Sequence, residues 1–132
     1  MKKEDKELLL KDLSARLPYG VKILHEGWNY EWDDELSTVE RVVGIDDKFV
    51  YTKVINTHNG EEYRDDKHTI SLFDDKIFLR PLSSMTEEEK DEYEMFHSFE
   101  QHLEFYLRGH FDFRGLIPKG LAIKAKEGMY NF

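Results

Sequence analysis

The chain has 132 residues, and its 19 lysines and arginines against 28 aspartates and glutamates give a formal net charge of -9. This length favours one domain, residues 1–132, with a core of its own. The absence of cysteine excludes disulfides, thiolate metal sites and a cysteine nucleophile. No apolar run approaches the roughly 20 residues that a membrane span needs, so we expect no membrane partner.

Charge is distributed unevenly along the chain. The net negative charge argues against general binding to duplex nucleic acid, which needs lysine and arginine to displace counterions from phosphates. Residues 108–132 carry +3, so the first 107 residues carry -12. An acidic body with a basic tail indicates either a tail that folds back on the body or an acidic partner. Short-range scatter of charge is the alternative explanation.

The first predicted element is a helix over residues 3–17. Leu9, Leu13 and Leu17 recur every four residues, which is the spacing of one helix face. Pro18 and Gly20 end this pattern, because proline disfavours a helical residue before it and glycine permits a sharp turn.

Residues 21–80 change to the period of β-strands. Trp28, Tyr30 and Trp32 alternate with polar residues, as in a half-buried strand. Paired aspartates separate the short apolar runs and favour turns, because their carboxylates bond nearby backbone amides. Expected strands cover residues 21–24, 28–32, 38–45, 49–55, 68–73 and 77–79.

Two of the aspartate pairs predict tight connections between antiparallel strands. They lie in Ile45-Asp-Asp-Lys48 and Phe73-Asp-Asp-Lys76, and Asn59-Gly60 predicts a further turn. Short strands joined in this way indicate a small, strongly bent antiparallel sheet or an SH3-like barrel over residues 21–80. Several of the strands are apolar on both sides, so the flanking helices are expected to cover the sheet.

A long helix is predicted over residues 86–107. Thr86 and Glu89 form a capping box, and Gly109 is the expected C-terminal stop. An aromatic stripe on this helix is expected to pack against the sheet. It comprises Tyr93, Phe96, Phe99, Leu103 and Tyr106. With an irregular basic tail over residues 108–132, in which Leu121–Ile123 is a last strand or an extended piece, the fold class is α+β.

The histidines give no pattern of a metal site. Glu94 and His97 share a helix face, but di-iron proteins need two such pairs and further glutamates. His25, His58 and His68 fall on strand ends or loops with no shared spacing. We therefore expect no metal and no cofactor.

Catalytic signals are also missing. Glu100 falls in or beside the aromatic stripe, where a carboxylate needs a partner such as Arg114 or a route to the surface. His102 is expected to be a partly buried, hydrogen-bonded side chain. No phosphate-binding glycine loop and no nucleophile elbow occurs in the sequence.

The binding candidates are aromatic and basic residues. Trp28, Tyr30 and Trp32 are either core or an exposed patch of the kind found at interfaces. Phe105 projects away from the stripe and is packed either by the tail or by a partner. The remaining candidates for partner binding are Arg108, His110 and Arg114, of which His110 lies near the two arginines and could join an anion site.

Three blocks of sequence, residues 8–21, 79–89 and 112–122, resemble a family of small proteins from gut Bacteroides-type bacteria and their phages or prophages. The family has no known activity, so the resemblance brings no functional residues. It implies a bacterial cytoplasm and an origin in a mobile element.

The first functional hypothesis is a non-enzymatic module that binds a protein partner. The second is a small hydrolase or nucleotide-processing enzyme, which requires one cleft formed by Glu100, His102, Arg108, His110 and Arg114. The third is an acidic decoy that mimics nucleic acid and requires a continuous stripe of carboxylates. The sequence leaves open whether the protein forms a homo-oligomer, and nucleic acid is not an expected partner.

Overall fold

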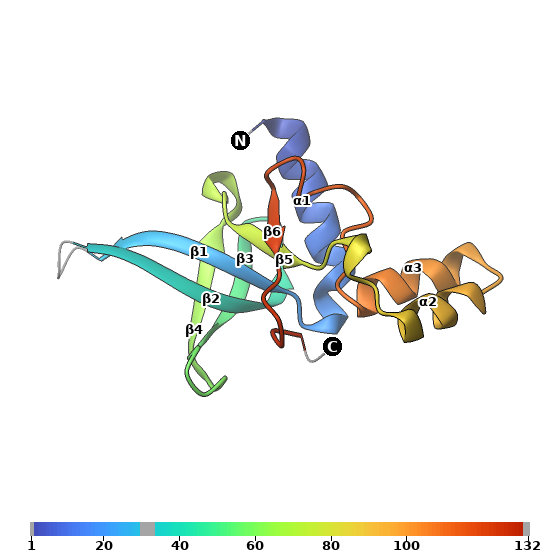
Figure 1. The fold of residues 1–132 in the computed structure, drawn as a ribbon. Helices are drawn as coiled ribbons and strands as arrows, with labels where there is room; N and C mark the ends of the chain where they lie inside the picture. Colours follow the sequence, from blue (N-terminus) through green and yellow to red (C-terminus); the bar gives the residue numbers. More distant parts are fainter. Residues whose placement is uncertain (1, 30–33, 131–132) are drawn as a thin grey trace.

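The computed structural model describes residues 2–29 and 34–130, and within them it shows an α+β fold around an open mixed sheet (Figure 1). Four strands form an antiparallel meander, a fifth pairs antiparallel with β1, and a sixth pairs parallel with β5. The strand order is β4-β3-β2-β1-β5-β6. The strands are β1 (Lys22–Asn29), β2 (Asp34–Ile45), β3 (Phe49–Ile55), β4 (Glu62–Thr69), β5 (Lys76–Leu79) and β6 (Ala122–Lys124).

One α-helix precedes the strands in the chain, and the other two lie between β5 and β6. The α-helices are α1 (Lys3–Arg16), α2 (Glu87–Glu94) and α3 (Phe99–Arg108). Short 3-10 helices cover Leu17–Tyr19, Ile70–Leu72 and Leu82–Ser84. None of the helices in the described ranges is long and apolar enough to cross a membrane.

The predicted N-terminal helix is confirmed as α1, and its leucine face forms the core. Leu9 and Leu13 have no exposed surface and pack against one face of the sheet. That face, called the covered face here, contributes Ile23, Val42 and Ile77 to the same cluster. Each leucine or isoleucine buried in this way contributes about 1.5–3 kcal/mol of transfer free energy.

The sheet differs from the prediction in closure and in strand direction. It is not closed into a barrel, because β4 and β6 remain as two separate edges. The sheet is also mixed rather than antiparallel, since the tail enters it as β6 parallel to β5. The Phe73–Lys76 segment is not a hairpin connection: it leads into β5, which pairs with β1 and not with β4.

The aspartate pairs have different roles. Asp46 confirms the predicted turn between β2 and β3, since its carboxylate accepts hydrogen bonds from the backbone N–H groups of Lys48 (2.8 Å) and Phe49 (2.7 Å). Asp65 and Asp66 instead lie inside β4. β4 is an exposed edge strand, where charged side chains remain solvated. The strand predicted over residues 68–73 overlaps β4 only at His68 and Thr69, and the rest of the prediction is wrong, because Ile70–Leu72 is a 3-10 helix.

The long helix predicted over residues 86–107 is two helices. Thr86 and Glu89 form the expected capping box of α2. A second capping box starts α3: Ser98 Oγ accepts from Gln101 N at 3.2 Å, and Gln101 Oε1 accepts from Ser98 N at 3.2 Å. Ser98 has an extended backbone, so the first helix cannot continue through it.

The aromatic stripe holds α2 and α3 together and does not cover the sheet. Tyr93 and Phe96 of the first half meet the rings of His102 and Phe105 of the second at 4.4–5.8 Å between centroids. Phe99 is 78% exposed. Figure 1 shows the helix pair projecting from the body on the side opposite the β1–β2 hairpin.

The basic tail folds back on the body, which is one of the two expected arrangements. Arg114 Nε donates to Asp12 Oδ1 (3.1 Å), and Arg16 Nε donates to Asp12 Oδ2 (2.7 Å). Asp12 and Arg16 have no exposed surface, so this pairing satisfies charges that would otherwise be costly to bury. Glu100 is exposed on α3 and is not the partner of Arg114.

Gly109 lies at the end of α3, as predicted, but the reason is a close approach by another residue. A Cβ atom at Gly109 would lie 2.5 Å from Cε2 of Phe111, whose ring is fully buried and stacks on Phe105. We expect Gly109→Ala to lower the free energy of unfolding by about 1–3 kcal/mol, measured by urea denaturation.

Gly44→Ala is the matched control for this substitution. A Cβ atom there makes only an ordinary contact, 3.7 Å from Tyr51 Cδ2, so the change should be below about 1 kcal/mol. Equal effects of the two substitutions would contradict the packing of Phe111 against the end of α3.

Candidate functional site

A row of apolar side chains crosses the face of the sheet opposite α1, called the open face here. Ile23 and Ile77 pair in register on the covered face, so Leu24 and Phe78 point to the open face. Leu24 pairs with Val39, Val39 with Ile55, and Phe78 with Ile123, which places these side chains on the same side. With Tyr63, every strand contributes one member: Tyr63, Ile55, Val39, Leu24, Phe78 and Ile123.

This row lines a groove of about 600 Å³. The polar residues Ser37, Thr38, Asn56 and Thr57 also line it, and Lys126 is the one charged residue among the described residues that line it. An adjoining hollow of about 380 Å³ shares Lys126 with the groove and is also lined by Lys22, Glu127, Gly128 and Met129. The groove is therefore lined by an apolar row with polar residues beside it, and its charged neighbours are two lysines, Lys22 and Lys126, and one glutamate, Glu127.

A buried polar cluster lies on the covered face beside the apolar core. Glu40 pairs with Ile23 in register and has no exposed surface. Its carboxylate accepts hydrogen bonds from Thr38 Oγ1 and Thr52 Oγ1, each at 2.6 Å, and lies 2.6 Å from His68 Nε2. Side chains from three adjacent strands therefore satisfy one carboxylate.

Asp75 and His25 extend this cluster toward solvent. Asp75 Oδ1 lies 2.9 Å from His25 Nδ1, and Asp75 Oδ2 lies 4.0 Å from His68 Nδ1. The two imidazole rings face each other with centroids 4.3 Å apart. Asp75 is buried, whereas the His25 side chain is 28% exposed, so the cluster reaches the surface through His25.

Burial and pairing act in opposite directions on these groups. Burial raises the pKa of Glu40, but the hydrogen bonds from His68, Thr38 and Thr52 outweigh it and hold this pKa at about 2. Burial lowers the pKa of His68, but the contact with Glu40 outweighs it and raises the value. The pKa of Asp75 is raised, because burial exceeds the effect of the two histidines.

His25, Glu40 and His68 also form the donor set most suited to a cation. One ring nitrogen of each histidine and one carboxylate oxygen of Glu40 lie within 4.8 Å of one another. The sequence predicted no metal site, since these histidines share no spacing. Alternation along the strands puts His25 on the same face as Ile23, and Glu40 on the same face as Val42. This signal indicates that polar side chains lie on the covered face, but it does not indicate that they contact one another.

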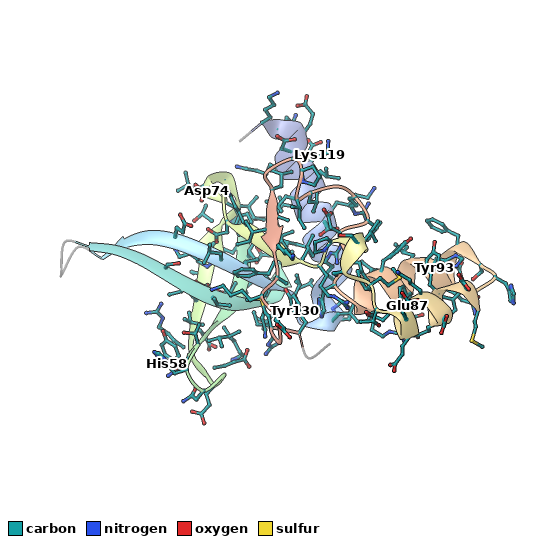
Figure 2. The ribbon with its side chains drawn as sticks, viewed as in Figure 1. His58, Asp74, Glu87, Tyr93, Lys119 and Tyr130 are labelled. Carbon is teal, nitrogen blue, oxygen red and sulfur yellow. The ribbon has the colours of Figure 1, made fainter. Side chains whose placement is uncertain are left out.

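The basic candidates of the tail do not form one site. Arg108 and His110 line a hollow of about 370 Å³ together with Arg80 and Glu89. His110 is buried and stacked on Tyr130 at 3.6 Å, and burial, with the charges of Arg16, Lys22 and Arg80, lowers its pKa to about 4. Figure 2 shows the Tyr130 side chain within the body of the protein.

The other predicted residues are distributed elsewhere. Phe105 is packed by the tail, because it is 3% exposed and stacks on Phe111. His102 lies against Tyr93 between α2 and α3, and Arg114 contacts Asp12. The five-residue cleft of the enzyme hypothesis is thus not formed. The side chains of Trp28, Tyr30 and Trp32 are not among those that the structure describes, so these candidates are not placed.

The Glu40 cluster predicts a loss of stability in acid. Its pKa is depressed from 4.5 to about 2, so the stabilisation is present above pH 4.5 and is lost as the pH falls toward 2. We expect the wild type to lose on the order of 3 kcal/mol more than Glu40→Gln over this range, measured by urea unfolding at a series of pH values. Parallel pH profiles for the two proteins would contradict this assignment.

Glu100→Gln, at an exposed position of α3, is the control for the loss of one carboxylate. Its pH profile should follow that of the wild type. Glu89 also has a pKa of about 2, owing mainly to its bond with Arg80, so the comparison must use the difference between proteins and not the wild-type curve alone.

Comparison with known proteins found no relative of this chain. No family model matches the chain, and no curated protein or solved structure matches it significantly.

Proposed function

We propose that the protein is a non-enzymatic interaction module that binds an apolar, acid-bearing segment of a partner protein in the groove of the open face. The observation that carries this proposal is the row of apolar side chains, one from each strand, which the registers place on the side of the sheet opposite α1. An apolar groove with convergent polar groups is the usual form of a binding site.

The charge of the groove selects the occupant. Lys126 lines the groove, and Lys22 lies at the adjoining end, where the ammonium group donates to the backbone O of Met129 at 2.6 Å. A segment with a carboxylate beside its apolar residues would complement this end. A second copy is a poorer occupant, because each copy carries a net charge of -9 and the two would repel.

The sheet edge is a less suitable docking place than its face. The exposed strand β4 has Asp65 bonded to Lys53 at 2.7 Å and Glu62 bonded to Arg41 at 2.7 Å. Charged side chains along an edge strand oppose pairing with another chain. The same pairs weaken the decoy hypothesis, since these carboxylates are neutralised rather than arranged in a stripe.

The enzyme alternative has little geometric support, because its five residues do not converge: Arg108 and His110 share one hollow, but His102 lies against Tyr93, Arg114 contacts Asp12, and Glu100 is exposed on α3. The cytoplasmic location and the origin in a bacterial mobile element or phage stay predictions from the resemblance. The proposal for the groove depends on neither of them.

A display library of random peptides against the immobilised protein tests the proposal. We expect the selected peptides to combine apolar residues with aspartate or glutamate and to bind in the micromolar range by calorimetry. Val39→Asp should weaken binding at least tenfold, because it places a carboxylate in the middle of the apolar row. Lys126→Glu should weaken binding more at low salt than at high salt.

Leu72→Asp is the matched control, since Leu72 is 79% exposed and does not line the groove. Tyr63→Ala, at a side chain that is 60% exposed, tests the groove without a buried charge in case Val39→Asp fails to fold. The proposal is overturned if no peptide is selected, or if the selected peptides bind equally well to the groove variants and the wild type.

A further inference from the structure

We propose that His25, His68 and Glu40 bind one divalent transition-metal ion, of which Zn²⁺ is the best fit, and that Asp75 positions both imidazole rings for it. This inference concerns the covered face of the sheet and is independent of the groove on the open face.

The contacts indicate which nitrogen each ring would offer: Nε2 of His25, and Nε2 of His68, where the ion would take the place of the proton between His68 and Glu40. His25 Nδ1 lies 2.9 Å from Asp75 Oδ1, which leaves Nε2 of His25 for an ion. His68 Nε2 lies 2.6 Å from Glu40 Oε1, and its Nδ1 faces Asp75 Oδ2 at 4.0 Å. Histidines that bind metals commonly present one nitrogen to the ion and donate the other N–H to a carboxylate, and Asp75 is placed to accept from both rings.

An unsatisfied oxygen gives independent support. The Asp75 side chain is 4% exposed, yet its Oδ2 atom has no hydrogen-bond partner within 2–29 and 34–130. A buried carboxylate oxygen without a partner is costly. His68 Nδ1 lies 4.0 Å from this oxygen, so a small rotation of the ring on metal binding that closes this distance would remove the cost.

The charge and type of the donors fit a borderline cation. Two carboxylates and two neutral imidazoles carry a charge of -2, which one divalent ion neutralises in a site of low solvent exposure. Nitrogen and oxygen donors without thiolate suit Zn²⁺ and its neighbours among the transition metals. Mg²⁺ and Ca²⁺ prefer sites made of oxygen donors, so this cluster should discriminate against them.

The site needs only a small adjustment to close on an ion. One nitrogen of each ring and one oxygen of Glu40 lie within 4.8 Å of one another, and donors around a tetrahedral Zn²⁺ at about 2.0–2.1 Å are about 3.4 Å apart. His25 is the ligand with room to move, because its side chain is partly exposed. Three protein ligands would leave a fourth position open to water.

Calorimetric titration of Zn²⁺ into untagged, chelator-treated protein tests the inference. We expect one ion per chain and a dissociation constant in the micromolar range or tighter. His25→Ala should weaken binding at least tenfold, and Ca²⁺ or Mg²⁺ should give no comparable heat. In the wild-type protein, the imidazole NMR signals of His25 and His68 should shift on addition of one equivalent of Zn²⁺, whereas those of His58 should not.

His58→Ala is the matched control. Figure 2 shows His58 at the turn between β3 and β4, far from Asp74, the neighbour of Asp75 in the chain. This variant should bind Zn²⁺ like the wild type. The NMR measurement keeps the test valid if a histidine variant fails to fold.

Asp75→Asn separates positioning from folding. If Asp75 positions the rings, Asp75→Asn should weaken Zn²⁺ binding by about 10–100-fold. The thermal stability of the metal-free variant should change little by comparison with the metal-free wild type. The inference is overturned if Zn²⁺ produces neither heat nor a shift of the two histidine signals, or if His25→Ala binds as tightly as the wild type.

Discussion

The charged carboxylate of Glu40 is fully buried, and side chains of the surrounding strands stabilise its charge. Thr38, Thr52 and His68 supply its partners from β2, β3 and β4. A slip of one residue in the β2–β3 or β3–β4 pairing would turn Thr52 or His68 to the opposite face, and Thr38, on the same strand as Glu40, would not replace the lost partners. The apolar contacts under α1 tolerate small changes in position, whereas this set of hydrogen bonds permits one register.

That register also divides the sheet into areas with different chemistry. On the covered face, Leu9 and Leu13 of α1 lie over the apolar half, and the segment that contains Phe73 and Asp75 supplies partners to the polar half. On the open face the same strands present the apolar row. An α+β protein with helices on one side of a sheet leaves the other side for a ligand or partner, and here that side contains a groove.

Local patterns predicted much of the chain, and contacts between distant residues explain the rest. The leucine spacing of α1, the bounds of β3 and the Thr86 capping box depend on neighbours in sequence and were predictable. The break before Ser98 had an equally local signal, the Ser98–Gln101 capping box, which the continuous aromatic pattern concealed. Asp75 meets His25 across 50 positions, and Arg114 meets Asp12 across 102. No periodicity encodes such pairs, so the polar cluster could not be predicted.

The groove and the polar cluster share strands but use opposite sides of them. Leu24 precedes His25 in β1, and Val39 precedes Glu40 in β2, so each pair places one side chain on each face. The backbones of β1 and β2 are fixed to each other along Lys22–Asn29, which resists displacement of one strand by a change at a single side chain. A cation would therefore act by moving imidazole rings rather than strands. The floor of the groove should keep its shape in both states, so binding in the groove and binding at the cluster are separable properties of one sheet.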